Sequence, residues 1–133
     1  IADFEFKISI YLKKVGLNIN ILNRYPSSLS GGQRQKVLIL KALLANPKLI
    51  IFDEPMSSLD INSQNEIIKI IKSLYLEGNI TILFITHDYR LIQALCNRVM
   101  VLSDGEIVED GKTSEVFANP IHKAKKKILE VVK

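Results

Sequence analysis

Two adjacent carboxylates follow a short apolar run. Residues 49–52 form a run suited to a buried strand, and Asp53 and Glu54 come directly after it. A buried strand needs no acidic side chains, so their position at its carboxyl end indicates a binding site at the edge of a sheet. In phosphate chemistry Asp53 would orient Mg²⁺ through water, and Glu54 would polarise the water that attacks a γ-phosphate. The alternative is that Asp53, Glu54 and Pro55 only open a turn after the strand.

A second cluster places two glycines at the start of a helical pattern. Its residues are Ser30, Gly31, Gly32 and Gln33. Glycines allow backbone N–H groups to approach a ligand closely, and a helix N-terminus adds partial positive charge. Together these features suit a phosphate group. The alternative is a serine-capped helix that begins with glycines.

The elements that must position these residues follow from the periodicity of the chain. Apolar runs at 49–52, 80–85 and 99–102 are typical of buried strands and alternate with helical patterns. This alternation predicts an α/β fold with a parallel sheet. The pattern at 33–45 should end before Asn46-Pro47, and Gly78 should end the helix that precedes the second strand. Asp104-Gly105 predicts the turn of a β-hairpin.

Composition limits the class of protein. The chain has 133 residues, of which 47% are hydrophobic and 24% charged, as in a folded globular domain. The net charge of +4 comes mostly from scattered lysines and does not indicate nucleic acid or a membrane surface as a partner. Cys96 is the only cysteine, so no internal disulfide can form. The longest apolar runs are four residues, against roughly 20 for a membrane-spanning helix.

The order of these groups resembles that of the ATP-binding cassette (ABC) ATPases. Residues 29–33 match the signature motif of that family, 49–54 the Walker B strand with its catalytic glutamate, 58–60 the D-loop, and His87 in 86–88 the switch histidine. The resemblance extends from about Tyr25 to Asn119. It implies the C-terminal portion of a P-loop NTPase (RecA-like) nucleotide-binding domain, with a parallel sheet and flanking helices.

The resemblance also implies roles for individual residues. Glu54 would be the catalytic base, His87 would contact the γ-phosphate, and Asp53 would hold Mg²⁺ through water. Ser30, Gly31, Gly32 and Gln33 would contact ATP held by a second cassette, because members of the family work as head-to-tail dimers. Asp60 would lie at the dimer seam, although by sequence it is equally a good N-cap for the following helix.

One expected motif is absent from this sequence. The phosphate loop Gly-x-x-x-x-Gly-Lys-Ser/Thr should precede the signature, yet Gly16 is the only glycine before Gly31. The first glutamine is Gln33, so the glutamine that the family places upstream of the signature is missing too. Gly111-Lys112-Thr113 follows a hairpin and is interpreted as a turn. We therefore expect a truncated cassette that neither binds ATP tightly nor hydrolyses it alone.

The expected organisation has three parts. Residues 1–46 would be the end of the helical subdomain, 47–119 the core with Walker B, D-loop and switch histidine, and 120–133 a C-terminal helix. Loss of the phosphate-loop strand should expose sheet edges and apolar surface, which favours self-association.

The resemblance implies a function at the membrane. The expected protein is the energy-coupling ATPase of a transporter, peripheral on the cytoplasmic face of the cell membrane, with a second ATPase subunit and transmembrane permease subunits as partners and no nucleic acid. Residues 115–122 resemble the tail of the oligopeptide and nickel importers, which suggests import of peptides or nickel. The alternatives are a soluble ABC-type ATPase of translation or DNA repair, and a non-catalytic cassette remnant.

Overall fold

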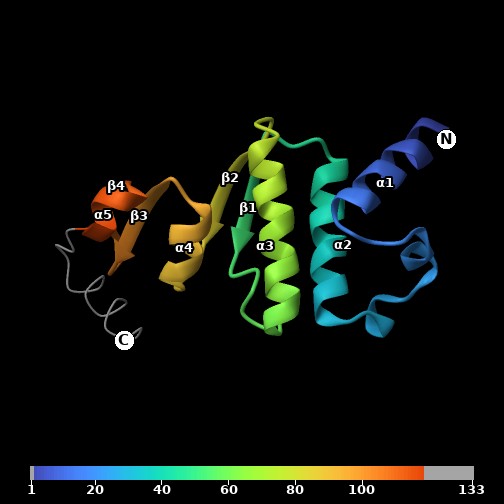
Figure 1. Cartoon of the computed structure of the whole chain (residues 1–133), viewed down its shortest axis with the longest axis horizontal. Coiled ribbons are helices and arrows are strands. Elements are labelled where there is room, and N and C mark those ends of the chain that lie inside the picture. Colours follow the sequence, from blue (N-terminus) through green and yellow to red (C-terminus); the bar gives the residue numbers. More distant parts are fainter. Residues whose placement is uncertain (1, 119–133) are drawn as a thin grey trace. The chain divides into compact units, whose positions relative to one another are not determined.

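A computed structural model describes residues 2–118 of the chain. Within these residues the chain forms two compact units, which meet between Leu83 and Phe84 in the sequence. The elements, in chain order, are α1 (Ala2–Lys14), 3-10 turns η1 (Ile19–Asn23) and η2 (Pro26–Ser28), α2 (Gly31–Leu44), β1 (Leu49–Asp53), α3 (Ile61–Leu76), β2 (Thr81–Ile85), α4 (Tyr89–Leu95), β3 (Arg98–Ser103), β4 (Glu106–Lys112) and α5 (Thr113–Ala118) (Figure 1). The expected helix at 120–133 lies outside the described residues.

Helix ends in the first unit follow local sequence signals. Helix α1 is followed by Gly16 at φ 65°, and the amide of Leu17 donates to the carbonyl of Leu12 in a Schellman arrangement. Helix α2 ends at Leu44, and Asn46 adopts φ 52° ahead of Pro47. Gly78, at φ 71°, follows the end of α3. The helix ends predicted from Pro47 and Gly78 are therefore confirmed.

Ion pairs tie the helices of this unit together. Lys14 of α1 pairs with Glu77 at the end of α3 over 2.6 Å. Lys36 of α2 pairs with Glu66 of α3 over 2.7 Å, and its side chain is only 13% exposed. Such pairs stabilise less than apolar burial does, but they fix which faces of the helices meet. The core of the unit consists mainly of Leu12, Val15, Ile39, Leu43, Ile50, Phe52, Ile67, Ile71 and Leu74.

Strands β1 and β2 form a two-stranded sheet joined through α3. The amide of Thr81 donates to the carbonyl of Lys48 over 2.8 Å, so both strands begin at the same edge. A β-α-β connection between strands that start together makes them parallel. Figure 1 shows their arrows pointing the same way. The α/β architecture with a parallel sheet is thus confirmed.

The second unit contains a β-hairpin. Strands β3 and β4 pair antiparallel, with a register shift between Val101 and Leu102. The turn residues Asp104 and Gly105 have φ values of 52° and 83°, which glycine and aspartate tolerate, as predicted. The interpretation of residues 111–113 as a turn was wrong: Gly111 and Lys112 continue β4, and Thr113 starts α5. Pairing with Val99 and Arg98 extends the strand through them.

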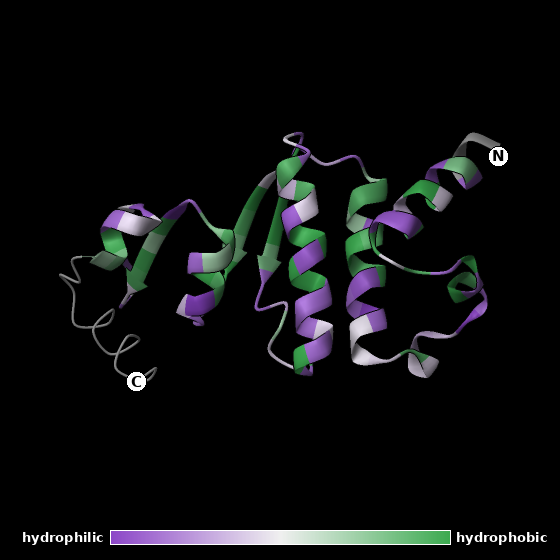
Figure 2. Ribbon diagram, in the orientation of Figure 1, coloured by the Kyte–Doolittle hydropathy of each residue, from purple (hydrophilic) through white to green (hydrophobic). Residues whose placement is uncertain are grey.

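Apolar side chains remain on the surface of the first unit. In β1, Ile50 and Phe52 are buried while Leu49 and Ile51 are 51% and 56% exposed. Figure 2 shows β1 and β2 as hydrophobic along most of their length. The expected exposure of apolar sheet surface is therefore confirmed. Among residues 2–118, no helix has the length and hydropathy needed to cross a bilayer.

Candidate functional site

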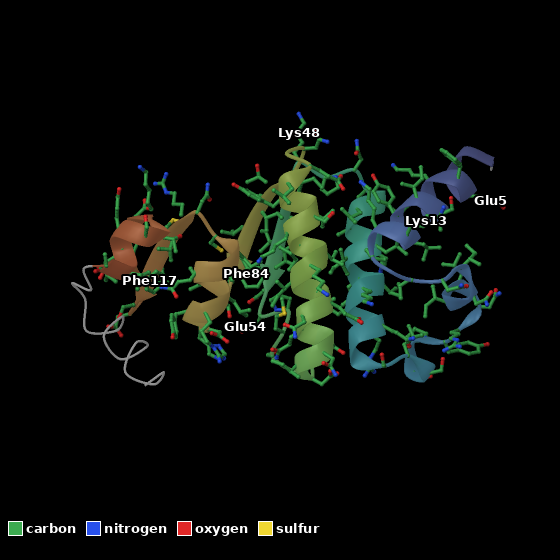
Figure 3. All side chains as sticks on the ribbon, viewed as in Figure 1. Glu5, Lys13, Lys48, Glu54, Phe84 and Phe117 are labelled. Carbon is green, nitrogen blue, oxygen red and sulfur yellow. The ribbon has the colours of Figure 1, made fainter. Side chains whose placement is uncertain are left out.

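Strand β1 delivers Asp53 and Glu54 to the edge of the sheet. Asp53 is the last strand residue and is exposed, whereas Glu54 is half-buried. Figure 3 labels Glu54 among the side chains. Glu54 has φ 45°, in the left-handed region that costs a non-glycine residue about 1–2 kcal/mol. This conformation turns the chain out of the strand at Glu54. Backbone strain of this kind is concentrated at functional sites in proteins.

A cavity of about 300 Å³ opens between α2 and β1. Its polar wall includes Gln35 of α2, together with Asp53, Glu54 and Ser58. Its apolar wall includes Leu38, Ile39, Ala42, Ile50, Ile51, Phe52 and Pro55. Carboxylates that line a pocket together with apolar side chains provide an anchor for polar or cationic groups and for ordered water. The two acids predicted from the sequence therefore line the same cavity.

The loop from β1 to α3 is short and internally bonded. The carbonyl of Glu54 accepts from the amide and the hydroxyl of Ser57, over 3.3 and 3.1 Å. Asp60 closes the loop as the N-cap of α3 and accepts from the amides of Asn62 and Ser63, each over 3.0 Å, and from the Ser63 hydroxyl over 2.7 Å. The hydrogen bond from the Ser63 hydroxyl, followed by that from its amide, holds the pKa of Asp60 below its usual range. Asp60 is thus an ionised cap at the surface.

The serine-glycine cluster forms a capping box. The Ser30 Oγ accepts from the amide of Gln33 over 3.2 Å, and the Gln33 Oε1 accepts from the amide of Ser30 over 3.1 Å. The alternative of a serine-capped helix is therefore correct as a description of the local structure. It does not exclude anion binding, because a capping hydroxyl keeps its O–H donor and a glutamine keeps its NH₂ donors. The helix N-terminus and these donors face the same end of α2.

Helix α2 and helix α3 meet closely at their N-terminal turns. Gly32 is buried, and a Cβ placed there would lie 2.7 Å from the Oγ and 3.0 Å from the Cβ of Ser63. A Cβ on Gly31 would lie 3.4 Å from Leu59, which is an ordinary contact. The structure therefore brings the 30–33 turn against the start of α3, next to Asp60.

His87 belongs to the second unit and lies on the loop between β2 and α4. The loop is ordered by Asp88, whose amide donates to the Thr86 Oγ1 over 3.1 Å and whose carboxylate caps α4 through the amide of Arg90 over 2.9 Å. The Arg90 guanidinium also donates to both carboxylate oxygens, and this contact holds the pKa of Asp88 below its usual range. His87 itself is exposed.

The residues could hold a magnesium ion only if water and substrate phosphates supplied most of its ligands. No group of three or more metal-ligating side chains occurs within the described stretch 2–118. Mg²⁺ is usually held by one or two carboxylates together with substrate phosphates and water. Asp53, which is exposed and lines the cavity, meets that requirement.

Three features of the site gave no recognisable signal in the sequence. They are the left-handed conformation of Glu54, the contact between Gly32 and Ser63, and the two hydrogen bonds that the Gln64 amide donates to the carbonyls of Met56 and Leu59. Hydrophobic periodicity does not predict the contact between Gly32 and Ser63, nor the hydrogen bonds of Gln64.

Comparisons with known proteins point in one direction. Residues 4–57 match the protein family described as ABC transporter. The chain is 47% identical over 116 residues to the oligopeptide transport ATP-binding protein OppF of Mycoplasma pneumoniae. The aligned region covers 87% of this chain and 14% of that protein. It is 41% identical over 131 residues to OppF of Streptococcus mutans, covering 98% of this chain and 42% of that protein.

Solved structures agree with these relatives. A putative metal-chelate type ABC transporter in an inward-facing conformation matches with TM-score 0.73 and 32% identity, over 83% of this chain and 44% of that one. A dimeric bacterial ABC transporter cassette matches with TM-score 0.68 and 34% identity, over 80% of this chain and 46% of that one. A dimeric cassette bound to ADP and Pi matches with TM-score 0.66 and 35% identity, over 77% of this chain and 44% of that one. This chain thus spans less than half the length of the relatives it matches.

Proposed function

Because the chain belongs to the ABC family of transporter ATPases, we propose that it is part of the subunit that couples ATP hydrolysis to import of oligopeptides. The main support is Glu54, a half-buried carboxylate that has a strained backbone conformation and lines the cavity of about 300 Å³. The oligopeptide assignment is supported by the printed names of the relatives. Nickel, the other cargo expected from the tail, has no comparable support.

Glu54 acts in this proposal as the general base. Its carboxylate accepts a proton from the water that attacks the γ-phosphate of ATP, which converts that water into a better nucleophile. His87, on the loop that Asp88 orders, donates a hydrogen bond to the γ-phosphate.

Asp53 is proposed to hold Mg²⁺ through water. The ion, when bound with ATP, supplies positive charge that offsets the charge of the phosphates. The exposed Asp53 side chain at the end of β1 is available for this contact.

The signature residues are proposed to serve a second cassette. In the capping box the side chains of Ser30 and Gln33 act only as acceptors, so the Ser30 hydroxyl and the Gln33 NH₂ group keep their donors. Gly31 and Gly32 start the helix that carries Gln33. Asp60 lies at the surface beside this turn, as a residue at a dimer seam should. The dimeric cassettes among the structural relatives support this pairing.

The wider assembly is also proposed. The complete subunit would be peripheral on the cytoplasmic face of the cell membrane and would bind transmembrane permease subunits, with no nucleic acid involved. Residues 1–46 would belong to the helical subdomain and 47–119 to the catalytic core. Because the phosphate-loop motif is absent from this sequence, the 133-residue chain by itself would neither bind ATP tightly nor hydrolyse it.

The decisive experiment measures the steady-state ATPase rate of the full-length gene product. We expect turnover by the wild type and by Glu106→Gln, a matched change on the exposed hairpin, and at least about a hundredfold loss in Glu54→Gln. The 133-residue chain should show none, and isothermal titration should detect no tight Mg-ATP binding to it. Equal rates for the chain and the full-length protein would overturn the account of the missing loop.

Cargo is tested in the reconstituted transporter. Addition of an oligopeptide together with the permease subunits should raise the ATPase rate and drive uptake of the labelled peptide. Stimulation by nickel, without stimulation by peptides, would contradict the oligopeptide assignment.

A further inference from the structure

The loop that joins β1 to α3 carries two proposed functional residues but has little core of its own. It runs from Glu54 to Asp60, and only Pro55 and Met56 within it are buried. Glu54 begins it in a left-handed conformation that an unsupported chain would leave. A contact from outside the loop would add to the hydrogen bonds that the loop makes within itself.

Gln64, in the first turns of α3, supplies that contact. Its Nε2 donates to the carbonyl of Met56 over 3.2 Å and to the carbonyl of Leu59 over 3.1 Å. Both hydrogen bonds are partly buried. The Met56 carbonyl also accepts from the amide of Leu59 over 3.2 Å, so one side chain anchors both ends of a backbone turn.

Gln64 is itself held in place by helix α3. Its backbone amide donates to the carbonyl of Asp60 over 2.9 Å, within the helix that Asp60 caps. Helix α3 is in turn fixed to α2 by the close approach of Gly32 to Ser63 and by the ion pair of Lys36 with Glu66. The loop is thus connected through Gln64 to two closely packed helices.

We propose that Gln64 is a positioning residue for ATP hydrolysis: its side-chain amide holds the 54–60 loop so that Glu54 and Asp60 keep fixed positions. This inference rests on the proposed function, but not on any contact of Gln64 with nucleotide. A displacement of about 1 Å in a catalytic group can lower a rate by as much as about a hundredfold. Loss of both loop anchors should therefore change catalysis more than binding.

The test compares four variants of the full-length protein. Gln64→Met removes the donors while keeping the length of the side chain, and Gln64→Glu keeps its shape but offers only acceptors to the two carbonyls. Gln64→Lys restores a donor that can reach them. Asn65→Met is the matched control, since Asn65 is the exposed neighbour on α3.

The first readout is amide hydrogen exchange of residues 57–60. Exchange there should rise at least about fivefold in Gln64→Met and Gln64→Glu, and stay within about twofold of wild type in Gln64→Lys and Asn65→Met. The thermal unfolding midpoint identifies any variant that has lost its fold globally. Unchanged exchange in Gln64→Met would overturn the proposal whatever the enzymatic result.

The second readout is the split between kcat and KM for ATP, with kcat expressed per bound nucleotide. We expect kcat to fall about tenfold or more in Gln64→Met and Gln64→Glu while KM stays within about threefold, with partial recovery in Gln64→Lys. Equal losses in Gln64→Met and Asn65→Met would contradict a positioning role. Absence of ATPase activity in the wild type would instead refute the proposed function and leave the exchange result standing.

Discussion

At the scale of single residues, Glu54 combines an unfavourable backbone with a proposed catalytic side chain. Its φ of 45° lies where glycine is favoured, and its carbonyl is held by the amide and hydroxyl of Ser57. The surrounding loop therefore imposes the conformation on Glu54. A residue chosen for stability alone at this position would be glycine.

This strain can be measured with two substitutions that both remove the carboxylate. We expect Glu54→Gly to unfold with a free energy about 1 kcal/mol higher than Glu54→Ala, because only the alanine retains a Cβ in the left-handed region. Urea titration of the two purified proteins at pH 7 gives the difference. Equal stabilities, or a more stable alanine variant, would show that Glu54 is not strained.

Asp60 predicts a specific dependence of stability on pH. Its folded pKa is depressed below the ordinary 3.8, so the ionised form stabilises the fold above that value, and the contribution disappears as pH falls through the folded pKa. Asn also caps helices but cannot ionise. The stability difference between wild type and Asp60→Asn, followed by thermal unfolding, should be constant near neutral pH and shrink below about pH 4. A difference that stayed unchanged down to pH 2 would contradict the assignment.

At the scale of elements, the contact between α2 and α3 determines how the 30–33 turn faces the start of α3. The helices approach so closely at Gly32 that any side chain there meets Ser63, whereas Gly31 has ordinary space. Lys36 and Glu66 continue the same seam one turn further along both helices. The serine-glycine turn is thus held by packing as well as by its own cap.

Two glycines that are neighbours in sequence should therefore respond differently to alanine. Gly32→Ala should lower the free energy of unfolding by about 1–3 kcal/mol through overpacking, while Gly31→Ala should change it by less than about 0.5 kcal/mol. Combining Gly32→Ala with Ser63→Gly removes the atoms that clash. A double-mutant cycle should show a coupling of at least about 1 kcal/mol. Additive effects would mean that these two residues do not press on each other.

At the scale of the whole molecule, the described chain leaves apolar strand surface uncovered. Leu49 and Ile51 of β1 are more than half exposed, and Leu83 of β2 is 38% exposed. Two strands are also fewer than a stable sheet normally requires. Such a surface favours association with another apolar surface, including that of a second copy of this chain.

The 133-residue chain should accordingly self-associate in solution. Sedimentation equilibrium should detect oligomers whose population rises with concentration. The double variant Leu49→Lys, Ile51→Lys should weaken the association at least about tenfold, equivalent to about 1.4 kcal/mol. Leu76→Lys is the control, because Leu76 is an apolar side chain that is 81% exposed but belongs to α3 and not to a strand. A wild-type chain that remained monomeric would contradict the prediction that the exposed apolar strand surface causes self-association.

The sequence by itself indicated the resemblance to the ABC family, the strands β1, β2 and β3 with helices α2 and α3, and most of the local turns. Strand β1, the cap at Ser30, the cap at Asp60 and the turn at Asp104-Gly105 all depend on contacts within a few residues, so short patterns predict them. The turn predicted at Gly111-Lys112 is wrong, because pairing with Val99 and Arg98 of β3 extends β4 through both residues. The proposed roles of the site residues remain predictions.

Only the tertiary structure decided what holds the site together. Hydrophobic periodicity predicts none of three features. They are the close approach of Gly32 to Ser63, the hydrogen bonds from Gln64 to the carbonyls of Met56 and Leu59, and the left-handed backbone of Glu54. Periodicity reports which face of an element is buried, but it does not report which residue on the next element that face meets. Those contacts arise only when the elements pack, because side-chain volume and hydrogen-bond geometry select them.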